Sequence, residues 1–256
     1  MKKAGCMIGL IVYLFLVGLV LGSFYNVVGL RIPAGQSIIH PRSFCPSCLR
    51  TIRIWELIPV CSYIWQKGKC RGCDVRIPLL YPSLELIHGL LFVLAFQLFG
   101  WSGETIVAWT LLALLTVIVA SDLGYMLIPN KILLFFLPVF VIERIFVPLQ
   151  PWWSGIAGAC ISFFFLFMIA ILSKGGIGGG DVKLFALLGF VLGIKGVLLA
   201  FFLASFLGTV FGVGGIIAGA MKRQSAIPFG PFIALGTIIS YFFEPNVLRY
   251  YFLLFP

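Results

Sequence analysis

An aspartate in a glycine-rich stretch is the residue of this chain most suggestive of chemistry. Asp181 ends the run Lys-Gly-Gly-Ile-Gly-Gly-Gly-Asp at 174–181, which lies between two long apolar stretches. An ionisable side chain at a membrane segment is by default a candidate for function. Backbone that is not helical is tolerated at membrane depth only where protein buries it or water reaches it, and glycine permits close approach of another backbone. The stretch therefore predicts a water-accessible active site that contains Asp181.

Asp122 is the expected partner of this carboxylate, because the chain has only three aspartates and the third, Asp74, lies in a polar segment. Two carboxylates held close together cannot both ionise cheaply, so they share one proton. One can then accept a proton from an attacking water while the other donates to the oxyanion, as in an aspartic protease. Two alternatives stay open from position alone. Each acid could cap a helix, or the pair could form ion or proton sites in a carrier or channel.

Four cysteines indicate a metal centre. Cys45, Cys48, Cys70 and Cys73 form the pattern C-x2-C-x21-C-x2-C, and two such pairs supply four thiolates for a tetrahedral structural zinc site. Two disulfides are the alternative, but stable disulfides are rare in a reducing cytoplasm, where we expect this segment to lie. A polar segment of this size also needs a cross-link such as a bound metal ion, because small domains bury too little apolar surface to be stable alone.

The composition identifies a polytopic membrane protein. The chain is 61% hydrophobic and 10% charged, with a mean hydropathy of +1.14, whereas an average soluble domain is about 25% charged. We expect an all-α fold of about eight transmembrane helices with a small zinc-stapled cytoplasmic domain between the first and second. The expected spans are 7–30, 83–99, 104–121, 131–148, 154–173, 182–197, 198–220 and 228–243, with a turn at 193–196 and a short apolar tail at the surface.

The distribution of charge sets the expected orientation. The segment 31–82 holds eight basic residues against two acids, a net charge of +6 out of the chain's +10. By the positive-inside rule this segment faces the cytoplasm, and both aspartates then lie on the same side. Lys2 and Lys3 oppose this orientation and are outnumbered. We expect three parts: a retained first helix (1–30), the zinc domain (31–82) and a membrane protease domain (83–256). Because the charge follows membrane topology, nucleic acid is not an expected partner.

Several motifs in order resemble the type IV prepilin peptidases, a family of membrane aspartyl proteases with a GxGD motif. The sequence resembles that motif at Gly178, Gly179, Gly180, Asp181 and Lys183, and the family's first aspartate motif at Asp122 with Ile-Pro-Asn at 128–130. Similar signatures occur at 22–33 and at 227–232. The resemblance implies that Asp122 and Asp181 are catalytic, in the cytoplasmic (inner) membrane of a bacterium. Gly178, Gly179, Gly180 and Lys183 would form the loop that an extended substrate approaches.

The polar segment resembles the cytoplasmic domain of the bacterial members. In that family this region is linked to N-methylation of the mature pilin from S-adenosylmethionine, and the resemblance implies a methylation site at Glu56 and Glu85. Family members with Asn after the first of these acids differ from this chain, where Leu57 follows. Composition and spacing alone do not indicate a methyltransferase.

The family's substrates are type IV prepilin or pseudopilin precursors, cut between a short basic leader and a long apolar helix. The positively charged segment does not attract a basic leader, so we expect it to meet anionic membrane lipids. Two rivals remain: a protease for other membrane helices, and a carrier with a zinc-stapled loop. Carriers often contain inverted repeats, with interrupted helices at matching places in both halves. The sequence contains a single Gly-rich interruption with no counterpart, which disfavours a carrier.

Overall fold

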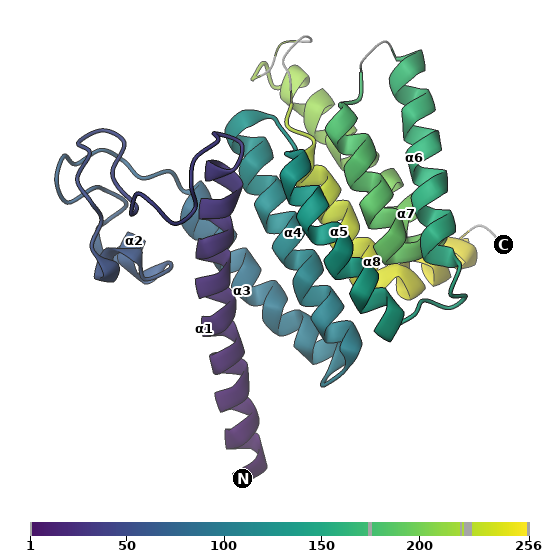
Figure 1. Cartoon of the computed structure of the whole chain (residues 1–256), viewed down its shortest axis with the longest axis horizontal. Coiled ribbons are helices and arrows are strands. Elements are labelled where there is room, and N and C mark those ends of the chain that lie inside the picture. The colour runs from purple at the N-terminus through teal and green to yellow at the C-terminus, as the bar shows by residue number, and fades with distance from the viewer. Residues whose placement is uncertain (1, 174–175, 221, 223–226, 255–256) are drawn as a thin grey trace. The chain divides into compact units, whose positions relative to one another are not determined.

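The computed structural model describes the chain except residues 1, 174–175, 221, 223–226 and 255–256 (Figure 1). Lys174 and Gly175 of the glycine-rich stretch lie outside the described residues. The regular elements of the described part are helical, with two isolated β-bridges. They are α1 (Lys2–Arg31), η1 (Ile54–Leu57), α2 (Cys61–Trp65), α3 (Leu80–Phe99), α4 (Gly103–Tyr125), α5 (Asn130–Phe146), α6 (Ser154–Leu172), α7 (Gly179–Ile217) and α8 (Gly230–Leu254).

The expected membrane spans correspond to these helices. Among the described residues, five helices are long and apolar enough to cross a membrane. One of them, α7, has 39 residues and is interrupted at Gly193 (φ 76°, ψ −177°), so it contains both spans expected in 182–220. The break occurs where a turn was expected, but the helix resumes at once and no loop separates the halves. The last expected span, 228–243, is the first part of α8, which continues to Leu254. The fold is that of an all-α polytopic membrane protein.

The chain forms two compact units, Met1–Ala120 and Ser121–Pro256, and α4 contributes to both. In the first unit, α1 packs on α3 through small residues. A Cβ added at Gly18 would lie 2.8 Å from Phe92 Cβ, and one at Gly22 would lie 2.9 Å from His88 Cβ. Small residues at such contacts let membrane helices approach closely where dispersion, rather than the hydrophobic effect, drives packing. Asn26 Nδ2 also donates to the carbonyl of Tyr81 at 3.3 Å.

In the second unit, α6, α7 and α8 lie side by side (Figure 1). A Cβ at Gly189 of α7 would collide with the backbone of Gly158 in α6, and the same holds in reverse. The break at Gly193 leaves backbone groups without helical partners, which is costly in hydrocarbon. Arg144 Nη2 donates to the carbonyl of Val191 at 2.6 Å, and the N–H of Ile194 donates to Ser154 Oγ at 3.3 Å. Side chains of α5 and α6 therefore stabilise the interruption.

Candidate active site and metal centre

Asp122 lies in the last turn of α4 and is buried, with 6% of its surface exposed. Its Oδ2 accepts a hydrogen bond from the backbone N–H of Gly230 at 2.6 Å. Gly230 is the first residue of α8, so this N–H is one of the donors that a helix leaves unpaired at its N-terminus. A Cβ added at 230 would stand 2.8 Å from both Cβ and Oδ2 of Asp122. Only glycine allows α8 to begin this close to the carboxylate.

Asp181 is the third residue of α7 and is half-buried. Its carboxylate accepts a hydrogen bond from the backbone N–H of Gly178, the N-cap residue of that helix. In a capping box the acid at the third helical position reaches back to the N-cap N–H in the same way. The glycine loop therefore fixes the Asp181 side chain.

The glycine loop also packs against the segment that follows Asp122. A Cβ at Gly180 would lie 2.9 Å from the Cβ of Ile128, so the backbone of the loop touches the α4–α5 connection directly. Beside this contact, Lys183 Nζ donates to Asn130 Oδ1 at 3.0 Å. Gly179 faces open space, where an added Cβ would meet no atom within 4 Å.

These contacts bring the two aspartates together in one compact unit. Both aspartates belong to this unit, and the Gly180–Ile128 contact joins the loop that precedes Asp181 to the segment that follows Asp122. Asp122 is buried against the start of α8, whereas Asp181 is partly open beside the exposed Gly178 and Gly179. Water and an extended chain can approach the pair from the side of the glycine loop. Such a pair can exchange a proton with a water molecule and with a carbonyl oxygen.

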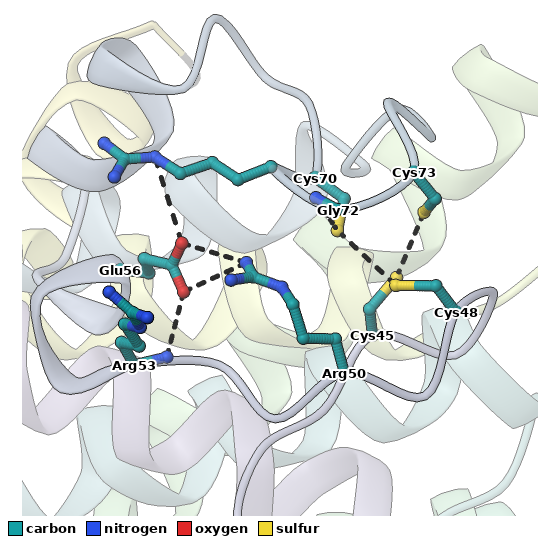
Figure 2. Close-up of polar contacts among 9 residues, drawn as sticks. Cys45, Cys48, Arg50, Arg53, Glu56, Cys70, Gly72 and Cys73 are labelled. Atoms are coloured by element: carbon teal, nitrogen blue, oxygen red, sulfur yellow. Dashed lines mark hydrogen bonds and ion pairs between the residues drawn. The ribbon is translucent and has the colours of Figure 1, made fainter.

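The four cysteines of the polar segment converge on one point. Their sulfur atoms all lie within 4.8 Å of one another, with Cys45 Sγ 3.8 Å from Cys73 Sγ and Cys48 Sγ 3.9 Å from Cys70 Sγ (Figure 2). Zn–S bonds of about 2.3 Å in a tetrahedron separate the sulfurs by about 3.8 Å, and a disulfide requires about 2.05 Å. The cysteines are free thiols, and the arrangement fits a metal ion and excludes the two disulfides.

Each pair of cysteines forms a knuckle of the same shape. The residue after each second cysteine has positive φ, 57° at Leu49 and 54° at Asp74, and its N–H donates to the carbonyl of the first cysteine of the pair. The loop N–H groups then point at sulfur: that of Gly72 reaches Cys70 Sγ at 3.4 Å and lowers the pKa of the Cys70 thiol to about 6. A thiolate is the form that binds metal.

Glu56 ties the two knuckles together (Figure 2). Its carboxylate accepts from Arg50 Nη2 at 2.9 and 3.1 Å and from the N–H of Arg53 at 2.9 Å, and Arg71 Nε lies 3.8 Å away. Arg50 follows the first cysteine pair and Arg71 lies inside the second. The Arg50 guanidinium, followed by the Arg53 N–H, holds the pKa of Glu56 below its usual range. This carboxylate is buried and fully engaged.

Glu85 has a different position, in the second turn of α3. Its buried carboxylate accepts the N–H of Val60 at 2.9 Å and interacts with the side chain of Ser23 in α1. Val60 precedes α2 and has φ 60°. Glu85 therefore joins the cysteine-containing segment to the α1–α3 pair, while Glu56 lies between the knuckles.

Comparison with known proteins identifies the family. Residues 16–99 match the Bacterial Peptidase A24 N-terminal domain, and residues 109–213 match the Type IV leader peptidase family. The prepilin leader peptidase/N-methyltransferase of Bacillus subtilis (strain 168) is 44% identical over 238 residues, 93% of this chain and 96% of the relative. The chain belongs to the type IV leader peptidase family. Proteins of the same name from Burkholderia pseudomallei (strain K96243) and Neisseria gonorrhoeae are 33% and 31% identical, over 90% and 91% of this chain and 84% and 90% of the relatives. No solved structure matches the chain.

Family membership confirms the resemblance seen in the motifs and identifies the chain as an aspartic-type membrane peptidase, rather than a carrier. Sequence reasoning missed two features of the site. Gly230 lies in the signature at 227–232, but nothing in that signature pointed to Asp122, 108 residues away. The pairing of Glu56 with Arg50 and Arg71 was also missed, although all three residues lie within or between the two C-x2-C motifs.

Proposed function

We propose that this protein cleaves the leader peptide from type IV prepilin or pseudopilin precursors and N-methylates the new N-terminal residue, with Asp122 and Asp181 as the catalytic pair. The observation that carries the assignment is the packing of the loop before Asp181 against the segment that follows Asp122, within one compact unit. The names of the relatives supply the substrate class. The active site and the cysteine domain lie on the cytoplasmic side of the inner membrane, as the positive charge of the segment 31–82 supports.

Peptide cleavage follows from one shared proton. The unprotonated carboxylate accepts a proton from water as the water oxygen bonds to the scissile carbonyl carbon, and the protonated carboxylate donates its proton to the carbonyl oxygen. The resulting gem-diol collapses and the C–N bond breaks. The departing nitrogen takes up the proton that came from water, and one hydroxyl of the gem-diol returns its proton to the carboxylate that had donated, which restores the shared proton. Because Asp122 Oδ2 accepts the Gly230 N–H and the Asp181 carboxylate accepts the Gly178 N–H, we assign the shared proton to a carboxylate oxygen that accepts neither of these.

The glycine loop admits the substrate. Gly178 and Gly179 are exposed beside Asp181, and the missing side chains leave room for an extended peptide backbone at the carboxylates. Lys183, through Asn130, fixes the start of α7 relative to the segment after Asp122. We assign Gly178, Gly179 and Gly180 to substrate approach and Lys183 to holding the loop in place.

The four cysteines bind a structural zinc ion. Four sulfurs at tetrahedral spacing leave no open coordination position, which is typical of structural rather than catalytic zinc. The ion would close the two knuckles around Glu56 and its arginines. The domain boundaries expected from the sequence, 31–82 for this domain and 83–256 for the protease, stay a prediction.

The methyl group comes from S-adenosylmethionine as co-substrate, as the names of the relatives support. The pilin amine must be unprotonated to take the methyl group from the sulfonium, so the reaction releases one proton. We infer that Glu56 serves this activity indirectly, by shaping the zinc domain, because its carboxylate is occupied by arginine. Glu85 stays the candidate for direct involvement.

Cleavage of a synthetic prepilin by purified protein in detergent tests the catalytic pair. Asp122→Asn and Asp181→Asn keep side-chain shape, and Asn at 122 still accepts the Gly230 N–H. We expect each to lower kcat by at least about 1,000-fold, as removal of one member of a catalytic unit does, with unchanged helical content and metal content. Asp74→Asn is the matched control, because asparagine tolerates positive φ, and should cleave normally. Cleavage at the wild-type rate by either 122 or 181 variant would remove that residue from the pair.

A further inference from the structure

The short helix η1 buries its charged side chain and exposes its apolar ones, the opposite of what is usual in a domain surrounded by water. It buries the carboxylate of Glu56 and exposes Ile54 and Trp55, with 77% and 76% of their surfaces accessible. The ion pair with Arg50 fixes Glu56 inward, so the neighbouring side chains must point outward. A domain facing only water gains by burying such side chains. The reversal indicates that this surface meets an apolar environment.

The next helix, α2, extends the same surface. It packs on η1 and exposes Ile64 and Trp65, at 66% and 68%. Two tryptophans and two isoleucines are therefore exposed on adjoining short helices. Tryptophan is enriched where proteins meet the membrane–water interface, because its ring is apolar while its N–H stays hydrated.

This surface lies next to a membrane helix. The N–H of Val60, which immediately precedes α2, donates to Glu85 in the second turn of α3. Five residues of α-helix extend only about 7.5 Å, so the whole of α2 stays close to the end of α3. Figure 1 shows α2 level with the C-terminal half of α1 rather than beyond its end. Both observations place α2 beside the membrane helices α1 and α3.

A cationic pocket adjoins the exposed tryptophan. It has a volume of about 420 Å³ and is lined by Trp65 together with Lys67, Lys69 and Arg71, against a single carboxylate. Three basic side chains beside an interfacial tryptophan match the phosphate of an anionic lipid. The same charge disfavours a basic peptide.

We propose that η1 and α2 form a membrane-docking surface: Ile54, Trp55, Ile64 and Trp65 enter the lipid interface, and the pocket at Lys67 and Lys69 binds the headgroup of an anionic phospholipid. The cysteine domain then lies on the leaflet instead of projecting into water. Its occupant is lipid of the same bilayer, because the surface is tethered to α3 and carries positive charge.

Tryptophan quenching in vesicles tests the docking surface. The full-length protein is reconstituted in phosphatidylcholine vesicles with about 30 mol% phosphatidylglycerol, an anionic fraction that gives a negative surface potential. The emission of the two residues is the difference between wild type and the double variant Trp55→Phe/Trp65→Phe. We expect this emission to be quenched by lipids brominated near the glycerol end of the acyl chain and to be insensitive to aqueous iodide. Quenching by iodide alone would overturn the proposal and leave a protein partner as the occupant.

The charge arm of the test compares brominated phosphatidylglycerol with brominated phosphatidylcholine. We expect the anionic lipid to quench more strongly, and Lys67→Gln and Lys69→Gln each to weaken that preference about fivefold. Equal quenching by both lipids in the wild type would overturn the headgroup site. Metal content confirms that each variant folds. Trp101 lies outside the surface and serves as a control: its emission is the difference between wild type and Trp101→Phe. Neither lysine substitution should change the quenching of this emission.

Discussion

Replacing Gly230 by alanine should displace one carboxylate of the proposed catalytic pair while leaving the fold intact. The φ angle of Gly230 is not in the positive range, and alanine is the better helix former by about 1 kcal/mol, so the backbone tolerates the change. The new Cβ would lie 2.8 Å from Cβ and Oδ2 of Asp122, where ordinary contact begins at 3.4 Å. Asp122 must therefore withdraw by about 0.6 Å, and its hydrogen bond to the Gly230 N–H weakens.

The expected effect is a loss of cleavage rate. A misplacement of about 1 Å in an active site costs about 100-fold, so we expect Gly230→Ala to lower kcat by roughly 10- to 100-fold. Single-turnover cleavage of a synthetic prepilin measures this directly, with thermal unfolding in detergent as the check on folding. Gly214→Ala is the matched control, because a Cβ there meets nothing within 4 Å. A kcat for Gly230→Ala within about twofold of the wild type, with Asp122→Asn inactive, would refute the idea that this contact positions Asp122.

Three further outcomes follow from the structure. Gly179→Ala should raise KM for the prepilin with little change in stability, because its Cβ meets open space in the free enzyme and can clash only with substrate. Glu56→Gln should weaken metal binding by about 10- to 100-fold in a chelator competition, since the loss of the carboxylate charge weakens the contacts to Arg50 and Arg53 that hold the chain between the two cysteine pairs. Gly189→Ala should destabilise the protein by about 1–3 kcal/mol or more in thermal unfolding, because its Cβ collides with the Gly158 backbone.

The pH dependence of metal affinity tests whether the effect of Glu56→Gln comes from the ion pair between Glu56 and Arg50. The folded pKa of Glu56 is lowered from 4.5, so its contribution to stability is present above the unfolded value and is lost as the pH falls through the folded one. Between about pH 5.5 and 8 the carboxylate stays ionised in both states. The difference in metal affinity between wild type and Glu56→Gln should therefore be constant over this range. A difference that disappears at about pH 6 would contradict the ion-pair explanation.

The sequence predicted those features that depend on local composition. The apolar runs located the membrane helices, and the glycine and lysine near 193 located a break in the long segment after Asp181. The sequence could not predict that the helix resumes at Ile194, because the break is stabilised by Arg144 and Ser154, about 40 to 50 residues away. Local patterning contains no information about which distant donors will meet a freed carbonyl.

In the candidate site, too, the sequence predicted what depends on residue type and spacing but not what depends on packing. The types and spacing of Asp122 and Asp181 indicated their chemistry, and the four cysteines indicated a metal. The Gly230 contact is a matter of packing, and the sequence gives no sign of it. The ion pairs of Glu56 were likewise beyond the sequence, because they exist only once the two knuckles have closed on each other; its role in methylation stays a prediction.

The closed knuckles also bear on how the protein is assembled. Forty-eight residues connect Arg31 at the end of α1 with Leu80 at the start of α3, and the cysteine cluster pins 45–73 into a small volume. Shortening the effective tether to about 20 residues lowers the entropic cost of bringing the two helices together by only about 0.8 kcal/mol. A chain synthesised under metal starvation should therefore still insert and pair α1 with α3. The deficit is confined to the cysteine-containing segment, so metal can be loaded after the membrane helices are in place.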